Sequence, residues 1–306
     1  MRSREVTGAT RGIAAFVAAS AVLVMLPGCG SDRESVSYAA LGDSYSSGEG
    51  TSSSDGDCGL SSSAYPELVA RRLAENGILE GTEGPEVDGG VFVFDACSGA
   101  EIDDVEGQLD SLGEQRFDLV TLTVGGNDVG FLDTLVDCVG ADDVVDAILD
   151  RDLAGVADRG CSFDDSEIEG RLAQLEGSLG ALYGRIVQDH LTEDGTLLVL
   201  GYPQLFEDPD DWPDSEGESC DGFAADDVRT LRTAAADLND TIRAATEVDE
   251  RVVFVDQTAG FAGHGRCSAE PWINGFEIRP RLLASFHPDE DGHLSSAEAT
   301  WQATGY

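Results

Sequence analysis

Short apolar segments alternate with longer segments of mixed polarity along most of the chain. The apolar segments are rich in valine, leucine and phenylalanine and are too short for helices, so we expect them to be buried strands. They are residues 36–41, 91–95, 119–124, 197–200 and 252–255. Continuous apolar runs of this kind are typical of a parallel sheet that is covered on both faces.

The segments between these strands repeat apolar residues at three- and four-residue spacing, which predicts amphipathic helices. In the longest of them, Leu172, Leu175 and Leu179 fall on one face. The predicted helices are residues 65–75, 144–149, 168–190, 224–245 and 295–303. Alternating strands and helices indicate right-handed β-α-β units, and therefore an α/β fold, a three-layer α/β/α sandwich in a single domain.

The N-terminus has the pattern of an export signal. Arginines precede an apolar run at residues 13–26 that is too short to span a bilayer comfortably. The run ends in a proline and a glycine before Cys29, which resembles a bacterial lipoprotein cleavage site. We therefore expect a signal peptide over residues 1–28, a lipidated Cys29 that begins a tether over residues 29–35, and a catalytic domain over residues 36–306. Ordinary secretion is the alternative.

The chain is strongly acidic, with 60 acidic residues, 18 basic residues that are all arginine, and a formal net charge of −42. This composition predicts a solvated acidic surface, whose self-repulsion is best tolerated where salt screens it. Nucleic acid is disfavoured as a partner, because phosphate contacts need clustered Lys and Arg. An anionic lipid surface is opposed in the same way at low salt. We expect a monomer that is extracellular or at the cell surface, with membrane contact only through the lipid anchor.

The most specific chemical signal, Gly42-Asp43-Ser44, follows the first predicted strand. A serine at this junction stands at the carboxyl edge of the sheet, where open α/β folds place their chemistry. Alone, such a tripeptide is more often an ordinary turn, and Ser46 and Ser47 are nearby polar loop residues. We expect the Asp43 carboxylate to hold the turn by accepting from backbone amides.

Two later segments supply the other parts of a serine hydrolase. Asn127, in a Gly-Gly-Asn-Asp segment after the third predicted strand, offers a side-chain amide donor. His287, in a Phe-His-Pro segment, offers a base that can take the proton from a serine hydroxyl. The other histidines, which fit structural positions better, are His190, His264 and His293.

Gly99, in an Ala-Cys-Ser-Gly-Ala segment, completes a series with Ser44, Asn127 and His287. This series resembles the four motif blocks of the SGNH hydrolases, also called GDSL-type esterases and lipases, in the same order. The resemblance covers residues 36–306 and is to the secreted actinobacterial branch. It implies a flavodoxin-like five-stranded parallel sheet of order 2-1-3-4-5, and an ester hydrolase that needs no metal and no organic cofactor.

The resemblance also implies a role for each block residue. Ser44 would be the nucleophile, and His287 the general base and then the general acid. The backbone N–H groups of Ser44 and Gly99 and the side-chain amide of Asn127 would form the oxyanion hole.

The residue that orients the histidine departs from the common family pattern. The family often has an aspartate three residues before its histidine, and here that position is Ala284. In the similar secreted members a main-chain carbonyl two residues before the histidine takes this role, which here is that of Ser285. We therefore expect a Ser44–His287 dyad, with the nearby Asp289 capping the last helix.

Apart from Cys29 the chain has six cysteines, and an even number in an exported protein indicates disulfides. Six cysteines allow about 15 pairings. We expect the sequential pairs, which the resemblance to the secreted branch also favours: Cys58–Cys97, Cys138–Cys161 and Cys220–Cys267. Two acidic, cysteine-bearing segments, 133–165 and 204–222, would form either the rim of the substrate site or plain surface loops.

These observations predict an exported lipase or carboxylesterase that cleaves acyl esters of lipids through an acyl-serine intermediate. Acylglycerols and simple lipid esters are the first substrate class we expect, A-type phospholipid esters the second and acetylated carbohydrates the third. The alternative from another class is a lipid-anchored binding protein that keeps the fold but has lost the chemistry.

Overall fold

The computed structural model describes residues 35–79, 92–131, 135, 165–213, 219–220, 223–275 and 284–306. The chain divides into two units, Met1–Arg33 and Glu34–Tyr306, and the first lies outside the described residues. The expected signal peptide and Cys29 therefore lie outside them too. Within the described ranges, no helix combines the length and the apolarity needed to cross a bilayer.

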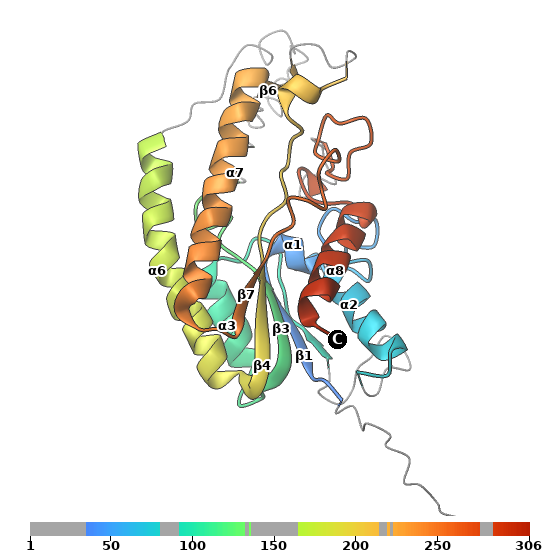
Figure 1. Ribbon diagram of the computed structural model, residues 1–306, viewed down its shortest axis with the longest axis vertical. Helices are drawn as coiled ribbons and strands as arrows, with labels where there is room; N and C mark the ends of the chain where they lie inside the picture. The colour runs from blue at the N-terminus through green and yellow to red at the C-terminus, as the bar shows by residue number, and fades with distance from the viewer. Residues whose placement is uncertain are drawn as a thin grey trace, which may run out of the picture. The chain divides into compact units, whose positions relative to one another are not determined.

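The second unit is built on a five-stranded parallel sheet (Figure 1). Its strands are β1 (Tyr38–Gly42), β2 (Phe92–Phe94), β3 (Phe117–Thr123), β4 (Leu191–Leu200) and β7 (Val252–Val255). They lie in the order β2-β1-β3-β4-β7, and every neighbouring pair is parallel. Counted along the chain, this is the order 2-1-3-4-5, so the predicted fold is confirmed.

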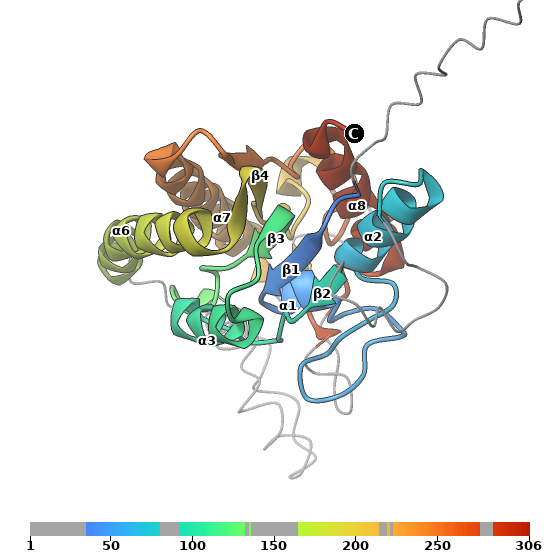
Figure 2. The same cartoon turned by 90° about the horizontal axis from the view of Figure 1, so that it is seen from below.

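Helices cover both faces of the sheet (Figure 2). One layer contains α3 (Ile102–Leu112), α6 (Asp165–Asp189) and α7 (Ala225–Ala245), and the other contains α2 (Tyr65–Glu75) and α8 (Glu290–Thr304). In β1, Ala39 packs in the core under the first layer, while Tyr38 and Ala40 pack under the second. Because both faces are buried, the strands are continuous apolar runs rather than alternating ones.

The remaining described elements are short. They are α1 (Ser44–Ser47), η1 (Pro209–Asp211), β5 (Ser219–Cys220), β6 (Phe223–Ala224) and η2 (Thr246–Val248). Of these, α1 begins directly after β1 and positions the candidate nucleophile.

Most bounds agree with the prediction to within three residues, and three of the longer elements differ by more. Helix α3 was not predicted, although its buried residues Ile102, Val105 and Leu109 have helical spacing. Strand β4 begins at Leu191 rather than 197, since polar residues interrupt its first half. Helix α8 begins at Glu290 rather than 295, because Asp289 caps a first turn made of polar residues. The predicted helix 144–149 lies outside the described residues.

Disulfides join Cys58 to Cys97 and Cys220 to Cys267, which are two of the three expected pairs. The third expected pair, Cys138–Cys161, lies outside the described residues, as does nearly all of segment 133–165. The first bridge ties the loop after α1 to the turn after β2, and the second ties β5 to the loop after β7. Both therefore fasten loops at the end of the sheet where the candidate site lies.

Candidate active site

The turn after β1 places Ser44 at the carboxyl end of the sheet. Gly42 has φ of 119°, and a Cβ there would lie 2.1 Å from the Thr123 carbonyl oxygen, so the position requires glycine. Asp43 is the N-cap of α1, and its Oδ1 accepts a hydrogen bond from the Tyr45 backbone N–H at 3.0 Å. Ser44 is the first residue of this single helical turn and is only 5% exposed.

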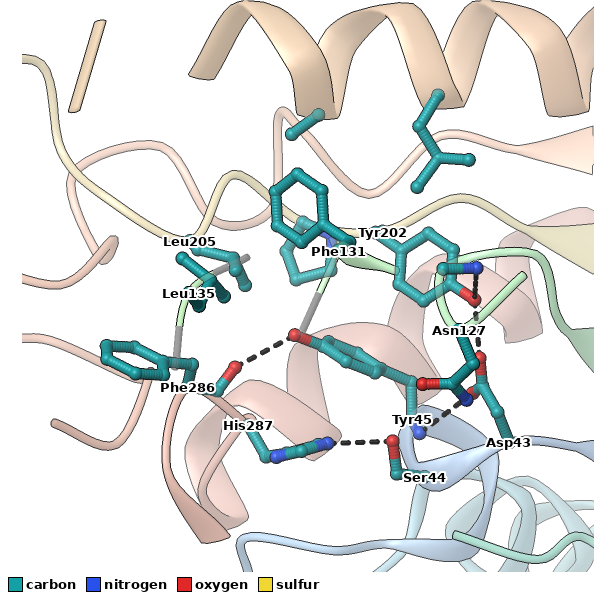
Figure 3. Close-up of a pocket in the computed structure, with 14 residues that line it drawn as sticks. Asp43, Ser44, Tyr45, Asn127, Phe131, Leu135, Tyr202, Leu205, Phe286 and His287 are labelled. Carbon is teal, nitrogen blue, oxygen red and sulfur yellow. Dashed lines mark hydrogen bonds between the residues drawn. The ribbon is translucent and has the colours of Figure 1, made fainter. Parts of the chain in front are cut away.

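The structure brings Ser44 and His287 together from distant parts of the chain (Figure 3). The Nε2 atom of His287 lies 2.7 Å from Ser44 Oγ, and its Nδ1 atom lies 2.9 Å from the carbonyl oxygen of Ser285. A carbonyl can only accept, so Nδ1 carries the ring proton, and Nε2 accepts from the serine hydroxyl. In this tautomer the imidazole can act as a base toward Ser44.

Ser46 and Ser47, the neighbouring serines, have other partners. Ser46 Oγ lies 3.0 Å from the Tyr65 hydroxyl and 2.8 Å from Thr123 Oγ1. Ser47 Oγ donates to the Ser44 carbonyl oxygen at 3.3 Å. Of the three serines in this turn, Ser44 is therefore the one whose hydroxyl is bonded to the imidazole.

Residues 284–286, directly before His287, include no acid. The nearest acid after His287 is Asp289, and it has a structural role. Ala284 is buried, and its carbonyl oxygen accepts the His287 backbone N–H at 3.2 Å. Asp289 Oδ1 accepts from the backbone N–H groups of Asp291 and Gly292, each at 3.0 Å. This carboxylate therefore satisfies the N-terminal amides of α8.

The Asp43 carboxylate joins the nucleophile turn to two other strands. Its Oδ1 accepts from Thr123 Oγ1 at 2.6 Å as well as from the Tyr45 N–H, and its Oδ2 accepts from the Tyr202 hydroxyl. We expected backbone amides as its partners, but two of its three donors are hydroxyl groups. Burial raises the pKa of Asp43 to about 6, against the opposing effect of these hydrogen bonds.

The sequence analysis did not identify two tyrosines of the site, Tyr45 and Tyr202. The Tyr45 hydroxyl donates to the Phe286 carbonyl oxygen at 2.8 Å, and the Tyr202 hydroxyl accepts from the Gly126 N–H at 3.0 Å. Their rings pack edge to face with centroids 5.0 Å apart. The partners of the two hydroxyls are distant in sequence, so no local pattern could have revealed these contacts.

The three candidate oxyanion donors are not equally placed. Ser44 and Asn127 line the pocket described below. Gly99 does not; it lies exposed in a turn next to Cys97, with φ of 82°. Asn127 Nδ2 donates to the Ala100 carbonyl oxygen at 2.9 Å, which links its segment to that of Gly99. An amide nitrogen has two N–H groups, so a second donor remains for a ligand in the pocket.

A mainly apolar pocket opens beside Ser44 and His287 (Figure 3). It has an empty volume of about 500 Å³, its mouth included. Its apolar lining comes from four separate parts of the chain and consists of Phe131, Leu135, Pro203, Leu205, Ala235, Leu238 and Phe286. A pocket with reactive polar groups on one side and apolar side chains on the others suits an ester whose acyl part is a hydrocarbon.

The remaining histidines lie elsewhere. His293 is fully buried, its Nδ1 accepts from the Tyr65 N–H at 3.3 Å, and burial lowers its pKa to about 4. His264 stacks on Trp272 with centroids 3.5 Å apart. His190 lies 3.3 Å, through Nδ1, from the carbonyl oxygen of Gln115. None of these three lines the pocket.

Comparison with known proteins places the whole arrangement in one family. The GDSL-like Lipase/Acylhydrolase family matches residues 40–294. A lipase from Streptomyces rimosus is 31% identical over 263 residues, which cover 85% of this chain and 83% of that protein.

Two solved structures are similar in fold as well as in sequence. The crystal structure of the extracellular lipase from Streptomyces rimosus has 29% identity and a TM-score of 0.64, and the match covers 88% of this chain and 100% of that one. Phospholipase A1 from Streptomyces albidoflavus has 27% identity and a TM-score of 0.65, with coverage of 87% and 98%.

The raised pKa of Asp43 predicts a specific dependence of stability on pH. Because the folded-state pKa, about 6, lies above the ordinary value of 3.8, the contribution of this group is present below about pH 4 and is lost as the pH rises through 6. A difference of this size corresponds to about 3 kcal/mol. The free energy of unfolding of the wild type, measured with urea, should therefore fall relative to that of Asp43→Asn between pH 4 and pH 6. A difference in the free energy of unfolding between the two proteins that stays constant over this pH range, or that shifts in favour of the wild type, would contradict this prediction.

Proposed function

Because this chain belongs to the GDSL-like Lipase/Acylhydrolase family and is a carboxylic-ester hydrolase, we propose that it cleaves acyl esters of lipids with Ser44 as nucleophile and His287 as base. The observation that carries this proposal is the 2.7 Å contact between Ser44 Oγ and His287 Nε2 at the wall of an apolar pocket. Ser44 and His287 both lie within the residues 40–294 that the family matches, which supports it.

In the proposed acylation step, Ser44 Oγ attacks the ester carbonyl carbon while His287 Nε2 takes the hydroxyl proton. The tetrahedral intermediate then collapses, and Nε2 gives that proton to the leaving alcohol, so that the acyl group remains on Ser44. In the second half, His287 Nε2 takes a proton from water while the water oxygen attacks the acyl carbon. The bond to Ser44 Oγ then breaks, Nε2 returns the proton to Oγ, and the carboxylic acid is released.

The negatively charged oxygen of the tetrahedral intermediate needs hydrogen-bond donors beside Ser44. We assign this role to the backbone N–H of Ser44, the second N–H of the Asn127 amide and the backbone N–H of Gly99. The contact between Asn127 and Ala100 supports this grouping, because it links the segments of Asn127 and Gly99. One such donor is typically worth about 3 kcal/mol of transition-state stabilisation.

The imidazolium that forms in each half-reaction is stabilised, in this proposal, by the Ser285 carbonyl. The 2.9 Å contact fixes the tautomer and the ring plane, which are the geometric part of the role that a triad carboxylate has. A neutral carbonyl stabilises the imidazolium less than a carboxylate would. With a carbonyl in this position, the proposed catalytic group is a Ser–His dyad.

Ser44→Ala and His287→Ala should each lower kcat/KM by about 10⁴-fold or more, because the nucleophile and the base depend on each other and neither acts alone. A fluorophosphonate probe should label the wild type at Ser44. Asp289→Asn is the matched control and should lower kcat less than tenfold, since asparagine can still accept from the amides of α8. A thousandfold loss in this control with the fold intact would replace the dyad by a triad. A folded wild type that neither hydrolyses esters nor reacts with the probe would favour the binding-protein alternative.

The pocket supports lipid acyl esters as the first substrate class and acetyl esters as a minor one, because an acetyl group would leave most of its apolar lining without contact. The similar Streptomyces albidoflavus enzyme is a phospholipase A1, so an A-type phospholipid ester is the second candidate. The net charge of −42 favours the uncharged ester over an anionic lipid at low salt.

Filling the pocket should shift the acyl-chain preference. Ala235 is buried on α7 and lines the pocket, whereas its neighbour Ala236 is exposed on the same helix. Ala235→Leu should lower kcat/KM for p-nitrophenyl esters of long acyl chains about tenfold, and for the acetate much less, because overpacking of this size costs about 1–3 kcal/mol. Ala236→Leu should leave the whole series unchanged. An equal loss on all chain lengths would show that the acyl chain does not occupy this pocket, and repeating the series on phosphatidylcholine would rank the two lipid classes.

We further propose export and a lipid anchor. The two disulfides and the extracellular relative support an oxidising location outside the cytoplasm. Protein made in a bacterium with lipoprotein processing should begin at Cys29, carry acyl mass and contain six oxidised cysteines. If mass spectrometry finds an unmodified N-terminus after Cys29, the lipid anchor is rejected and ordinary secretion remains. Free thiols among the six cysteines would contradict the disulfide scheme.

A further inference from the structure

The orientation of His287 depends on the backbone of its own loop. The group bonded to Nδ1, the Ser285 carbonyl, belongs to the same short segment, so the ring keeps its direction only while residues 285–287 keep their conformation. Phe286, between them, has φ of 60°. Among the described residues only Cys267 shares such a left-handed conformation without being glycine. Side chains of L-residues rarely adopt it, so contacts from outside the segment must hold it.

One set of contacts comes from Asn274. The Phe286 N–H donates to the Asn274 carbonyl oxygen at 3.1 Å, and the Asn274 N–H donates to the His287 carbonyl oxygen at 2.9 Å. The Asn274 side chain donates to the same His287 carbonyl at 3.0 Å and to the Gly50 carbonyl at 2.9 Å. These bonds fasten the loop to the segment that precedes it in the chain and to Gly50 in the loop after α1, but none of them reaches α1 itself.

That connection is made by Tyr45, the residue after Ser44. Its hydroxyl donates to the Phe286 carbonyl oxygen at 2.8 Å, and its ring centroid lies 5.1 Å from that of His287 (Figure 3). Because Tyr45 follows Ser44 in α1, one side chain spans from the helical turn of the nucleophile to the strained residue that precedes the base.

Tyr45 is itself held rigidly. Its backbone N–H donates to Asp43 Oδ1 at 3.0 Å, and its ring packs edge to face on Tyr202. Burial, with the nearby Asp43 charge, raises the pKa of the Tyr45 hydroxyl far above the working range, so the group remains a donor. A rigid hydroxyl that stays protonated is suited to fix the distance between the turn of Ser44 and the segment of His287.

We infer that Tyr45 is a positioning residue for the Ser44–His287 pair: its hydroxyl holds Phe286 in the left-handed conformation that aims His287 Nε2 at Ser44 Oγ. This inference rests on the proposed roles of Ser44 and His287. Tyr45 does not touch the reacting atoms through its hydroxyl, whose hydrogen bond goes to a backbone carbonyl. Its contribution is therefore geometric, and it should be visible in kcat rather than in KM.

Tyr45→Phe tests the inference, because it removes the hydroxyl and keeps the ring. We expect kcat to fall about tenfold to 10²-fold with KM changed less than twofold, as for misplacements of about 1 Å in other enzymes. The rate of fluorophosphonate labelling at Ser44 should fall in parallel. The acidic limb of the kcat/KM profile should move to lower pH, because a loosened Nδ1–H···O contact stabilises the imidazolium less.

Tyr38→Phe is the matched control. Like Tyr45→Phe, it removes a tyrosine hydroxyl with one hydrogen-bond partner, here Thr121 Oγ1 at 2.8 Å, but on a fully buried core strand. It should lower the melting temperature about as much as Tyr45→Phe while leaving kcat and the pH profile unchanged. This comparison separates lost positioning from lost stability.

Three results would overturn the inference: an unchanged kcat in folded Tyr45→Phe, an effect confined to KM, which would make the phenol a substrate contact, or equal losses of kcat in Tyr45→Phe and Tyr38→Phe. In each case a wild type that is active and is labelled at Ser44 leaves the proposed function standing. A wild type without activity would overturn both.

Discussion

The geometry of the site depends on the hydrogen bonds that the buried carboxylate of Asp43 accepts. It receives hydrogen bonds from Thr123 at the end of β3, from Tyr202 just after β4 and from the Tyr45 amide in the turn after β1. These three strands are neighbours in the sheet, so one side chain fixes the spacing of three strand ends. The Tyr202 hydroxyl extends the network to the Gly126 amide, beside Asn127. Burial of a charge is unfavourable, and three donors partly offset it; the remainder appears as the raised pKa.

In the proposed dyad, the histidine ring is oriented by a backbone carbonyl rather than by a second carboxylate. A triad acid can be placed on any loop that reaches the ring, and its charge tolerates small errors of position. A carbonyl two residues away in the same loop can orient the ring only if the loop has a single conformation. The strained φ of Phe286, the bonds from Asn274 and the bond from Tyr45 are consistent with that demand. In this design the accuracy of the site depends on loop packing, which includes Phe206 and Phe223 around the Phe286 ring.

The sequence was sufficient for those parts of the structure that depend on local patterns. Helix α2 and strand β7 have the predicted bounds, and two disulfides follow the expected sequential pairing. The family motifs placed Ser44 and Asn127 after β1 and β3, whose carboxyl ends lie at one edge of the sheet, and His287 in the segment before the last helix. Helix α3 has a clear helical spacing of apolar residues at Ile102, Val105 and Leu109, and its omission was a fault of the prediction. Elsewhere prediction failed where the signal was weak or distant. The first half of β4 is polar and has no strand pattern. The partners of Tyr45 and Tyr202 depend on how loops meet in three dimensions, which no spacing along the chain records.

The acidity of the chain and the chemistry of the site are connected through charge. Cleavage of an uncharged ester at neutral pH produces a carboxylate anion, while the substrate itself has no charge for the protein to repel. A net charge of −42 therefore opposes the retention of the product without opposing the entry of a neutral ester. Among the described residues that line the pocket, Asp43 is the only carboxylate, and its two oxygen atoms are already bonded to Thr123, Tyr45 and Tyr202. In the proposed function the apolar lining of the pocket receives the acyl chain, while the surrounding acidic surface acts on the charged product. Because salt screens the surface charge within a few ångströms at molar concentration, this influence is strongest at low ionic strength.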